Sequence, residues 1–159
     1  MARQLRPVEL DFVDTAPVRL VFATEVSASA EELYRALAEE VETMPQWFAA
    51  VKQARPLAGG AGREIRLAGG VRFQETILAK EPSTRYAYRV DTTNAPGMRA
   101  LLEIWLLTPT ANGTRVQWTF AADASAPVRV SLKLVRAGLG RSFRDAVRAL
   151  DRRLAATPA

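Results

Sequence analysis

The sequence predicts an α+β fold in which a curved antiparallel sheet packs against one long C-terminal helix. The first observation is that strand and helix patterns are segregated along the 159 residues, as one strand, two short helices, six strands and a final helix. The second is that apolar residues recur at steps of three and four from Pro127 to Ala155, which predicts a helix with one apolar stripe. A helix with a single apolar stripe needs a broad apolar surface to pack on, which the sheet would provide. We therefore expect the helix and the sheet to enclose a cavity.

The chain begins with a segment of mixed composition. Residues 1–16 show no regular pattern and are expected to form a loose N-terminal arm. A single domain is expected to follow over residues 17–156, a length that suits one hydrophobic core. Its first strand is predicted from Val18 to Val26, where apolar and polar side chains alternate.

Two short helices are predicted directly after this strand. Ser29 can cap the first of them, and Glu32 three residues later completes a capping box. Pro45 disfavours the helical conformation at the residue before it, so we expect this helix to end near residues 40–43. A second short helix is predicted from Pro45 to Val51.

Strand patterns and turn signals then alternate as far as residue 123. Gly69-Gly70 is typical of a two-residue hairpin turn, and Asn112-Gly113 is a second strong hairpin signal. The glycine clusters at 59–62 and 69–70 lie between strands, so we interpret them as turns and not as phosphate-binding loops. The strands are predicted near residues 55–57, 63–68, 71–80, 85–90, 101–108 and 115–120.

Two features of these elements leave alternatives open. Gly138 and Gly140 fall inside the C-terminal helix, where each costs about 1 kcal/mol relative to alanine. Either the helix bends there, or the missing side chains allow close packing on the sheet or leave space for a ligand. The strand from Leu101 to Leu107 is apolar on both faces apart from Glu103, so its register is not fixed. One of its faces could meet a partner subunit in a homodimer, or an extra layer of the chain.

The composition restricts the chemistry. The chain has no cysteine and no histidine, which excludes thiolate nucleophiles, metal sites built from these residues and a histidine general base. We therefore expect neither a metal site nor a cofactor, and any acid–base chemistry falls to a carboxylate, Tyr or Lys. We find no signal peptide and no apolar run long enough to span a bilayer, so we expect a cytoplasmic protein without a transmembrane segment.

Positive charge is concentrated in the C-terminal helix. Residues 128–156 hold eight basic and two acidic side chains. Their net charge of +6 exceeds the +5 of the whole chain. One interpretation is a solvated outer face, and the other is contact with an anionic membrane or phosphate group. No nucleic-acid partner is expected.

Several local patterns, taken in order, resemble the START-like helix-grip superfamily, also called SRPBCC, and within it the bacterial-type polyketide cyclase/dehydrase-like group. The resemblance covers about residues 18–155 and rests on residues 26–34, Met44-Pro45-Gln46-Trp47, Lys80-Glu81-Pro82, residues 85–88, Leu107-Thr108-Pro109 and residues 113–118. It implies a seven-stranded antiparallel sheet wrapped around the C-terminal helix, with a deep apolar cavity between them. The two short helices would surround the cavity mouth.

The cavity is expected to be mostly apolar with a few polar groups. The predicted lining residues are Trp47, Phe73, Glu75, Tyr88, Glu103, Trp105, Trp118, Phe120, Leu139 and Phe143. Any of the aromatic residues could instead serve only as core.

Glu75 and Glu103 are the polar residues of greatest interest. Buried carboxylates need a partner or a raised pKa. One interpretation is a cross-strand ion pair, with Arg66, Arg72 or Arg89 as the cation. The other is a ligand-orienting or acid–base role, in which Glu75, Glu103 and Tyr88 are the catalytic candidates.

Three functions remain at this point. The first is binding of a hydrophobic small molecule, such as a lipid, quinone or polyketide, in the internal cavity. The second is an enzyme similar to polyketide cyclases and dehydrases, working mainly by confinement and orientation. The third is a module that binds anionic surfaces through the basic face of the last helix.

Overall fold

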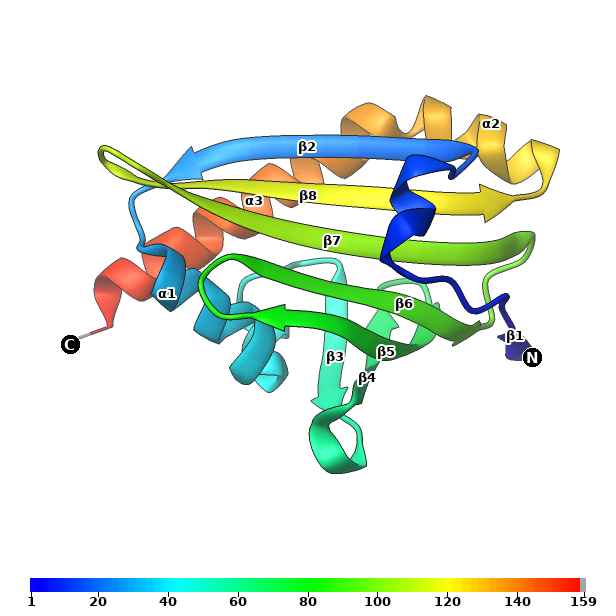
Figure 1. Cartoon of the computed structure of the whole chain (residues 1–159), viewed down its shortest axis with the longest axis horizontal. Helices are drawn as coiled ribbons and strands as arrows, with labels where there is room; N and C mark the ends of the chain where they lie inside the picture. The colour runs from blue at the N-terminus through cyan, green and yellow to red at the C-terminus, as the bar shows by residue number, and fades with distance from the viewer. Residues whose placement is uncertain (158–159) are drawn as a thin grey trace.

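The computed structural model describes residues 1–157, and its elements follow the predicted order (Figure 1). The strands are β1 (Arg3–Gln4), β2 (Val18–Val26), β3 (Val51–Pro56), β4 (Gly62–Leu67), β5 (Arg72–Glu81), β6 (Arg85–Thr93), β7 (Met98–Thr110) and β8 (Gly113–Ala124). The helices are α1 (Ala30–Tyr34), α2 (Ala126–Leu134) and α3 (Arg136–Ala156), with short 3₁₀ or π turns at Leu10–Asp14, Arg35–Glu39, Val41–Gln46 and Ala58–Gly60.

The main sheet is antiparallel and has the strand order β2-β8-β7-β6-β5-β4-β3, with the short β1 paired to β6. It curls around α3, which crosses behind the strands in Figure 1 and packs against β2. The helix buries Phe143, Val147 and Leu150 on the side that faces the sheet. The predicted helix-grip architecture, with seven strands around a C-terminal helix, is confirmed.

The first helix begins as the sequence predicts, but the second lies elsewhere. The Ser29 hydroxyl accepts a hydrogen bond from the Glu32 amide at 3.2 Å, and the Glu32 carboxylate accepts one from the Ser29 amide at 3.0 Å. The helix predicted from Pro45 to Val51 is wrong, because the helical turn spans Val41–Gln46 and Val51 begins β3. Pro45 lies inside this turn, which is a tight 3₁₀ turn and not an α-helix.

The predicted single helix from Pro127 to Ala155 is also wrong. Val135, with φ −91° and ψ 4°, separates α2 from α3, although its amide still donates to the Ser131 carbonyl at 2.9 Å. Val135 is exposed and therefore does not belong to the buried stripe. The helix is thus interrupted at Val135 and not at the two glycines, which lie within α3.

The glycines of α3 have different surroundings. A Cβ at Gly140 would lie 3.0 Å from Cδ1 of Phe22, so this position is glycine because helix and sheet approach closely. A Cβ at Gly138 would meet nothing within 4 Å. Gly140 therefore supports the close-packing alternative.

The expectation that residues 1–16 form a loose arm is wrong. The Leu5 amide donates to the Asp91 carbonyl at 2.8 Å, and the Arg6 amide donates to the Arg99 carbonyl at 2.9 Å. Val8 and Phe12 then pack on the outer face of the sheet as part of a second hydrophobic cluster. This segment crosses the front of β6, β7 and β8 in Figure 1.

The N-terminal segment explains why β7 is apolar on both faces. Leu102 and Ile104 point outward and are buried in the same cluster as Phe12. Glu103 and Trp105 point inward toward α3, in the main core or on the cavity wall. The extra layer is thus supplied by the chain itself. No helix within residues 1–157 has the length and apolar character needed to cross a bilayer.

Candidate functional site

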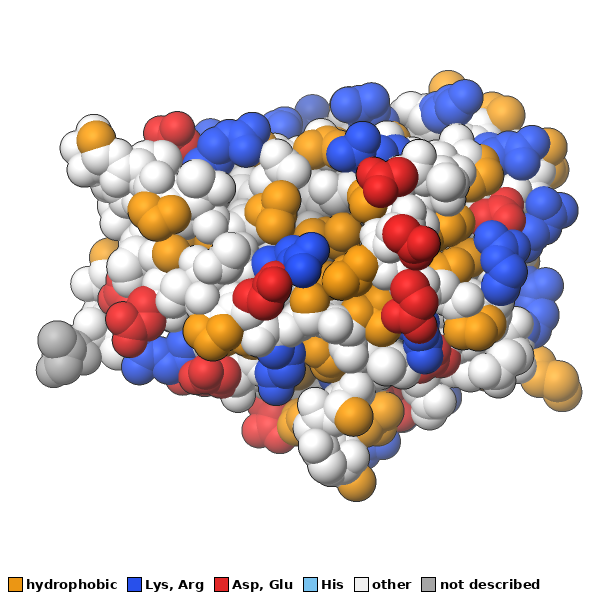
Figure 2. All heavy atoms as spheres, in the orientation of Figure 1, with side chains coloured by type: hydrophobic (Ala, Val, Ile, Leu, Met, Phe, Trp, Pro, Cys, Tyr) orange, Lys and Arg blue, Asp and Glu red, His pale blue; other side chains and the backbone are white. Residues whose placement is uncertain are grey.

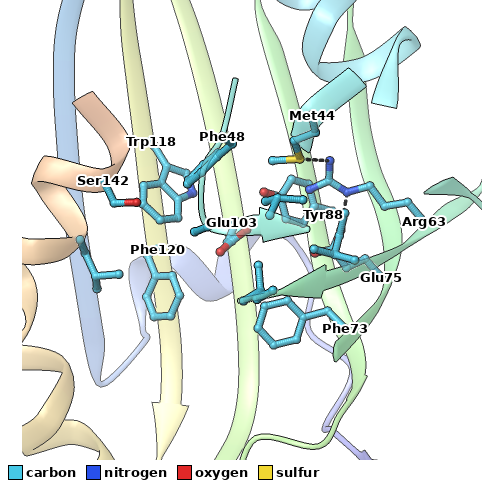
Figure 3. Close-up of a pocket in the computed structure, with 15 residues that line it drawn as sticks. Met44, Phe48, Arg63, Phe73, Glu75, Tyr88, Glu103, Trp118, Phe120 and Ser142 are labelled. Carbon is cyan, nitrogen blue, oxygen red and sulfur yellow. Dashed lines mark hydrogen bonds and ion pairs between the residues drawn. The ribbon is translucent and has the colours of Figure 1, made fainter. Parts of the chain in front are cut away.

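A cavity of about 160 Å³ lies between α3 and the concave face of the sheet (Figure 3). Its lining residues are Met44, Phe48, Ala50, Val51, Arg63, Ile65, Leu67, Phe73, Glu75, Tyr88, Glu103, Trp118, Phe120, Leu139 and Ser142. Half-buried residues of α3 and of strands β4 and β5, such as Leu139, Ser142 and Phe73, mark the side on which the cavity approaches the surface. The site is therefore a pocket inside the fold, mostly apolar and reached beside α3.

The structure separates the predicted lining residues into two groups. Those on the cavity wall are Phe73, Glu75, Tyr88, Glu103, Trp118, Phe120 and Leu139. Trp105 and Phe143 are buried but do not line the cavity, and Trp47 lines a different groove beside Gly138 and Arg141.

Trp105 and Phe143 hold the wall in place from behind. The Trp118 ring stacks on Trp105 at 5.7 Å between centroids and on Phe143 at 5.9 Å, with interplanar angles of 22° and 20°. Such aromatic pairs fix ring orientation as well as burying apolar area. Trp118 therefore presents a rigid face to the cavity.

Glu75 forms a buried ion pair with Arg63, which lies directly opposite it on β4. The Arg63 guanidinium also lies against the face of Tyr88, with Cζ 4.0 Å from the ring centroid, in a cation–π contact. Figure 3 shows Arg63, Glu75 and Tyr88 grouped on one side of the cavity.

The partners proposed for Glu75 from the sequence are wrong. Arg89 pairs with Glu9 at 2.8 Å and with Asp91 at 3.0 Å on the outer side of the sheet. Arg66 lies 3.9 Å from Glu64, and Arg72 is exposed. The sequence does not indicate Arg63, because a two-residue turn at Gly69-Gly70 would place a different residue opposite Glu75. The Leu67 amide bonds to the Val71 carbonyl, which makes the loop one residue longer and shifts the register.

Glu103 lies on β7 opposite Tyr88, and both are buried on the cavity wall. The Tyr88 hydroxyl accepts a hydrogen bond from Nε1 of Trp105 at 3.1 Å. Tyr88 is therefore held in place by Trp105, and its oxygen is directed toward the polar side of the cavity.

Burial and charge together set the protonation of this cluster. The pKa of Glu103 is raised to about 7, mainly by burial and then by the negative charge of Glu75, while the Tyr88 hydroxyl and Arg63 act in the opposite direction. Burial also raises the pKa of Glu75, but the adjoining Arg63 opposes that effect. Burial holds the pKa of Tyr88 well above its usual value of 10.0, so the phenol stays neutral. Near neutral pH, Glu103 is thus the carboxyl that exchanges its proton.

The cavity wall also contains a donor without an acceptor. Nε1 of Trp118 is buried and has no hydrogen-bond partner among residues 1–157, and the same holds for Nε1 of Trp47. A buried unpaired donor carries a free-energy cost, which a bound acceptor could remove.

Several cavity residues had no signal in the sequence. Met44 lies in the 3₁₀ turn Val41–Gln46, and Phe48 lies in the segment that follows it. Ser142 lies on the side of α3 that faces the cavity. Their place on the wall follows from the packing of segments far apart in the chain, which periodicity does not report.

Comparison with known proteins adds a family match. The family model described as polyketide cyclase / dehydrase and lipid transport matches residues 17–155. An uncharacterised protein of Mycobacterium tuberculosis is 27% identical over 150 residues, which cover 91% of this chain and 89% of the relative.

Solved structures share the fold at lower identity. A START superfamily protein from Mycobacterium smegmatis superposes with a TM-score of 0.68 at 16% identity, covering 85% of this chain and 95% of that chain. A protein in the dynemicin biosynthetic locus superposes with a TM-score of 0.63 at 21% identity, covering 87% of this chain and 47% of that chain. At these identities the two likenesses concern the fold.

Proposed function

Because this chain belongs to the polyketide cyclase/dehydrase and lipid transport family, we propose that it binds a small, ring-containing apolar molecule between α3 and the sheet. The observation that carries the proposal is the make-up of the cavity wall. Aromatic and aliphatic side chains form most of it, and the charged groups come from the neighbouring strands β4 to β7. This combination is typical of ligand pockets, where apolar area supplies affinity and a few polar atoms fix orientation.

The volume of the cavity limits the size of the enclosed group. About 160 Å³ is close to the roughly 150 Å³ of an engineered apolar cavity that binds benzene. It is smaller than the roughly 300 Å³ at which pockets for drug-sized ligands begin. The enclosed part of the ligand is therefore about one ring, and any longer chain leaves through the mouth beside Leu139 and Ser142.

The polar side of the cavity favours a ligand oxygen. Below pH 7 most Glu103 carboxyls carry a proton and can donate it in a hydrogen bond. Arg63 and Glu75 neutralise each other, so neither attracts a charged ligand strongly. A carbonyl or phenolic oxygen on the ring would fit this corner better than a carboxylate or an amine.

A second function, acid–base catalysis on the bound molecule, is favoured by the same Glu103. A carboxyl with a pKa near neutrality can both accept and donate a proton at working pH. In a dehydration, Glu103 would remove the proton next to a ligand carbonyl and return it to the departing hydroxyl. A carbon–carbon double bond forms and water leaves. Tyr88, which stays neutral, would orient the carbonyl oxygen.

Native mass spectrometry of the protein purified from its own host tests the binding proposal. We expect one equivalent of an apolar, ring-containing molecule, which extraction would identify. An empty protein whose melting temperature does not rise with phenols, quinones, aromatic polyketides or lipids would contradict the proposal. Turnover is distinguished from binding by incubation with a hydroxylated ligand, since only an enzyme releases a product lighter by one water.

A further inference from the structure

Helix α2 and the junction residue Val135 expose large apolar side chains. Val130 is 57% exposed, Leu134 79% and Val135 50%, and α2 contains no buried residue. Apart from Met1, these are the large hydrophobic residues that residues 1–157 leave most exposed. These three apolar side chains are therefore not used by the core of the fold.

The same stretch is surrounded by positive charge. Arg129, Lys133, Arg136, Arg141 and Arg144 all lie between Asp123 and Asp145, with no acidic residue among them. None of the five forms an ion pair within the part of the chain that the structure describes. Figure 2 shows basic and hydrophobic side chains next to one another on the edge where α2 lies in Figure 1.

Three of these arginines surround a shallow hollow. Arg136, Arg141 and Arg144 line it together with Phe22, Ala137 and Gly140. The missing side chain of Gly140 leaves room for the Arg144 guanidinium, whose Nη1 lies 3.2 Å from the place of a Cβ. The hollow thus has an apolar floor and a cationic rim, a combination that suits a phosphate group attached to an apolar chain.

We propose that this surface, formed by residues 129–144 around the α2–α3 junction, docks the protein on a bilayer containing anionic phospholipid. Leu134 and Val135 enter the interface between headgroups and acyl chains, and the arginines of the hollow bind lipid phosphates. Cationic amphipathic helices bind membranes in this way, through buried apolar area and attraction to anionic lipid. The basis is charge complementarity with adjacent apolar exposure, which is independent of the ligand proposed for the cavity.

The surface lies next to the candidate ligand site. Leu139 lines the cavity and follows Val135 by about one helical turn. Docking at the α2–α3 junction would therefore bring the α3 side of the cavity close to the membrane, from which an apolar ligand could be taken up.

Cosedimentation with lipid vesicles tests the proposal. We expect the wild type to bind vesicles of phosphatidylcholine with one third phosphatidylglycerol, and to bind vesicles of pure phosphatidylcholine at least tenfold more weakly. Each arginine near an anionic surface contributes about a fivefold factor in affinity. The double variant Arg136→Glu/Arg141→Glu should therefore lose at least about 25-fold in affinity. Arg136 and Arg141 are both exposed, so we expect this variant to fold.

The matched control is Arg148→Glu/Arg152→Glu, which makes the same change in net charge on exposed residues of the same helix. This control variant should lose less than about threefold in affinity for the anionic vesicles. Leu134→Trp adds a reporter whose fluorescence should shift to the blue with anionic vesicles and not with inorganic phosphate. No binding to anionic vesicles, equal losses in both double variants, or binding only to free phosphate or nucleic acid would overturn the proposal.

Discussion

Arg63 and Glu75 face each other across β4 and β5 in an ion pair whose side chains are only 3% and 2% exposed. The same guanidinium lies on the ring of Tyr88. Among the described residues, no arginine or lysine lies within ion-pair distance of Glu103, the other carboxyl on the cavity wall. The cation of this cluster is therefore paired with Glu75, and Glu103 has no ion-pair partner among residues 1–157 to oppose the rise of its pKa.

Breaking the buried pair should destabilise the fold strongly. Arg63→Met leaves the Glu75 charge buried without its partner, and we expect a loss of about 3–5 kcal/mol in the free energy of unfolding. The double variant Arg63→Met/Glu75→Leu should lose less than Arg63→Met alone, because no uncompensated charge remains. Urea unfolding measures both.

The exposed pair of Arg55 and Glu64 provides the control. Its atoms are 3.2 Å apart, but the Arg55 side chain is largely in solvent, so Arg55→Met should cost at most about 1 kcal/mol. A double variant less stable than the Arg63→Met single would contradict this account of the buried pair.

The protonation of Glu103 should depend on Glu75. Burial is the main cause that raises the pKa of Glu103 from 4.5 to about 7, and the negative charge of Glu75 is the second. In Glu75→Gln that charge is absent and Arg63 has no other carboxylate to face. We therefore expect the pKa of Glu103 to fall, as measured by carboxyl-carbon NMR titration. A pKa that stays the same or rises would contradict this effect of the Glu75 charge.

Glu103 should also make stability depend on pH. Its pKa is about 7 in the folded protein against a usual value of 4.5, so between these values the folded state binds more protons. Stability therefore falls as pH rises from about 4.5 to 7 and levels off above 7, with an upper limit of about 3 kcal/mol from this group. Unfolding curves of Glu103→Gln should lack this component, whereas the exposed control Glu39→Gln should retain it. Equal pH profiles for the wild type and Glu103→Gln would contradict the assignment.

The fold could be predicted because its signals are local. Alternation in the strands, the capping box at Ser29 and Glu32 and the period of α3 each depend on neighbouring residues. The break at Val135 could not be predicted in this way, since the apolar period continues through it. Phe12 was missed for the opposite reason, because one buried aromatic residue in a 3₁₀ turn makes no pattern.

The candidate site was predicted in part for a related reason. Simple alternation put Glu75 on the same face as Phe73, and both lie on the cavity wall. The cation beside Glu75 depends on strand register, which one extra residue in the loop at 68–70 changes. Sequence reasoning thus found the side chains of single strands but not the pairs between strands.

The N-terminal segment should stabilise the sheet from outside. Phe12→Ala removes a buried ring from the cluster over Leu102 and Ile104, and we expect a loss of about 3 kcal/mol in the free energy of unfolding. Val13→Ala, at a neighbouring half-buried position, should cost less than half as much. Deletion of residues 1–16 exposes the apolar outer face of β7, so the shortened chain should self-associate in sedimentation velocity. A shortened chain that is as stable as the full chain and does not associate would contradict this role.

Filling the mouth of the cavity should weaken ligand binding without unfolding the protein. Leu139 is half-buried on the cavity wall, and a larger indole there would occupy volume that the ligand ring needs. In Leu139→Trp we expect at least a tenfold loss of affinity for the molecule extracted from the wild type, measured by calorimetry, because overpacking displaces the ligand before the core. Leu154→Trp is the matched control, since Leu154 is also half-buried on α3 but lies outside the cavity. Wild-type affinity in Leu139→Trp would place the ligand elsewhere, and an equal loss in both variants would indicate that α3 itself had shifted.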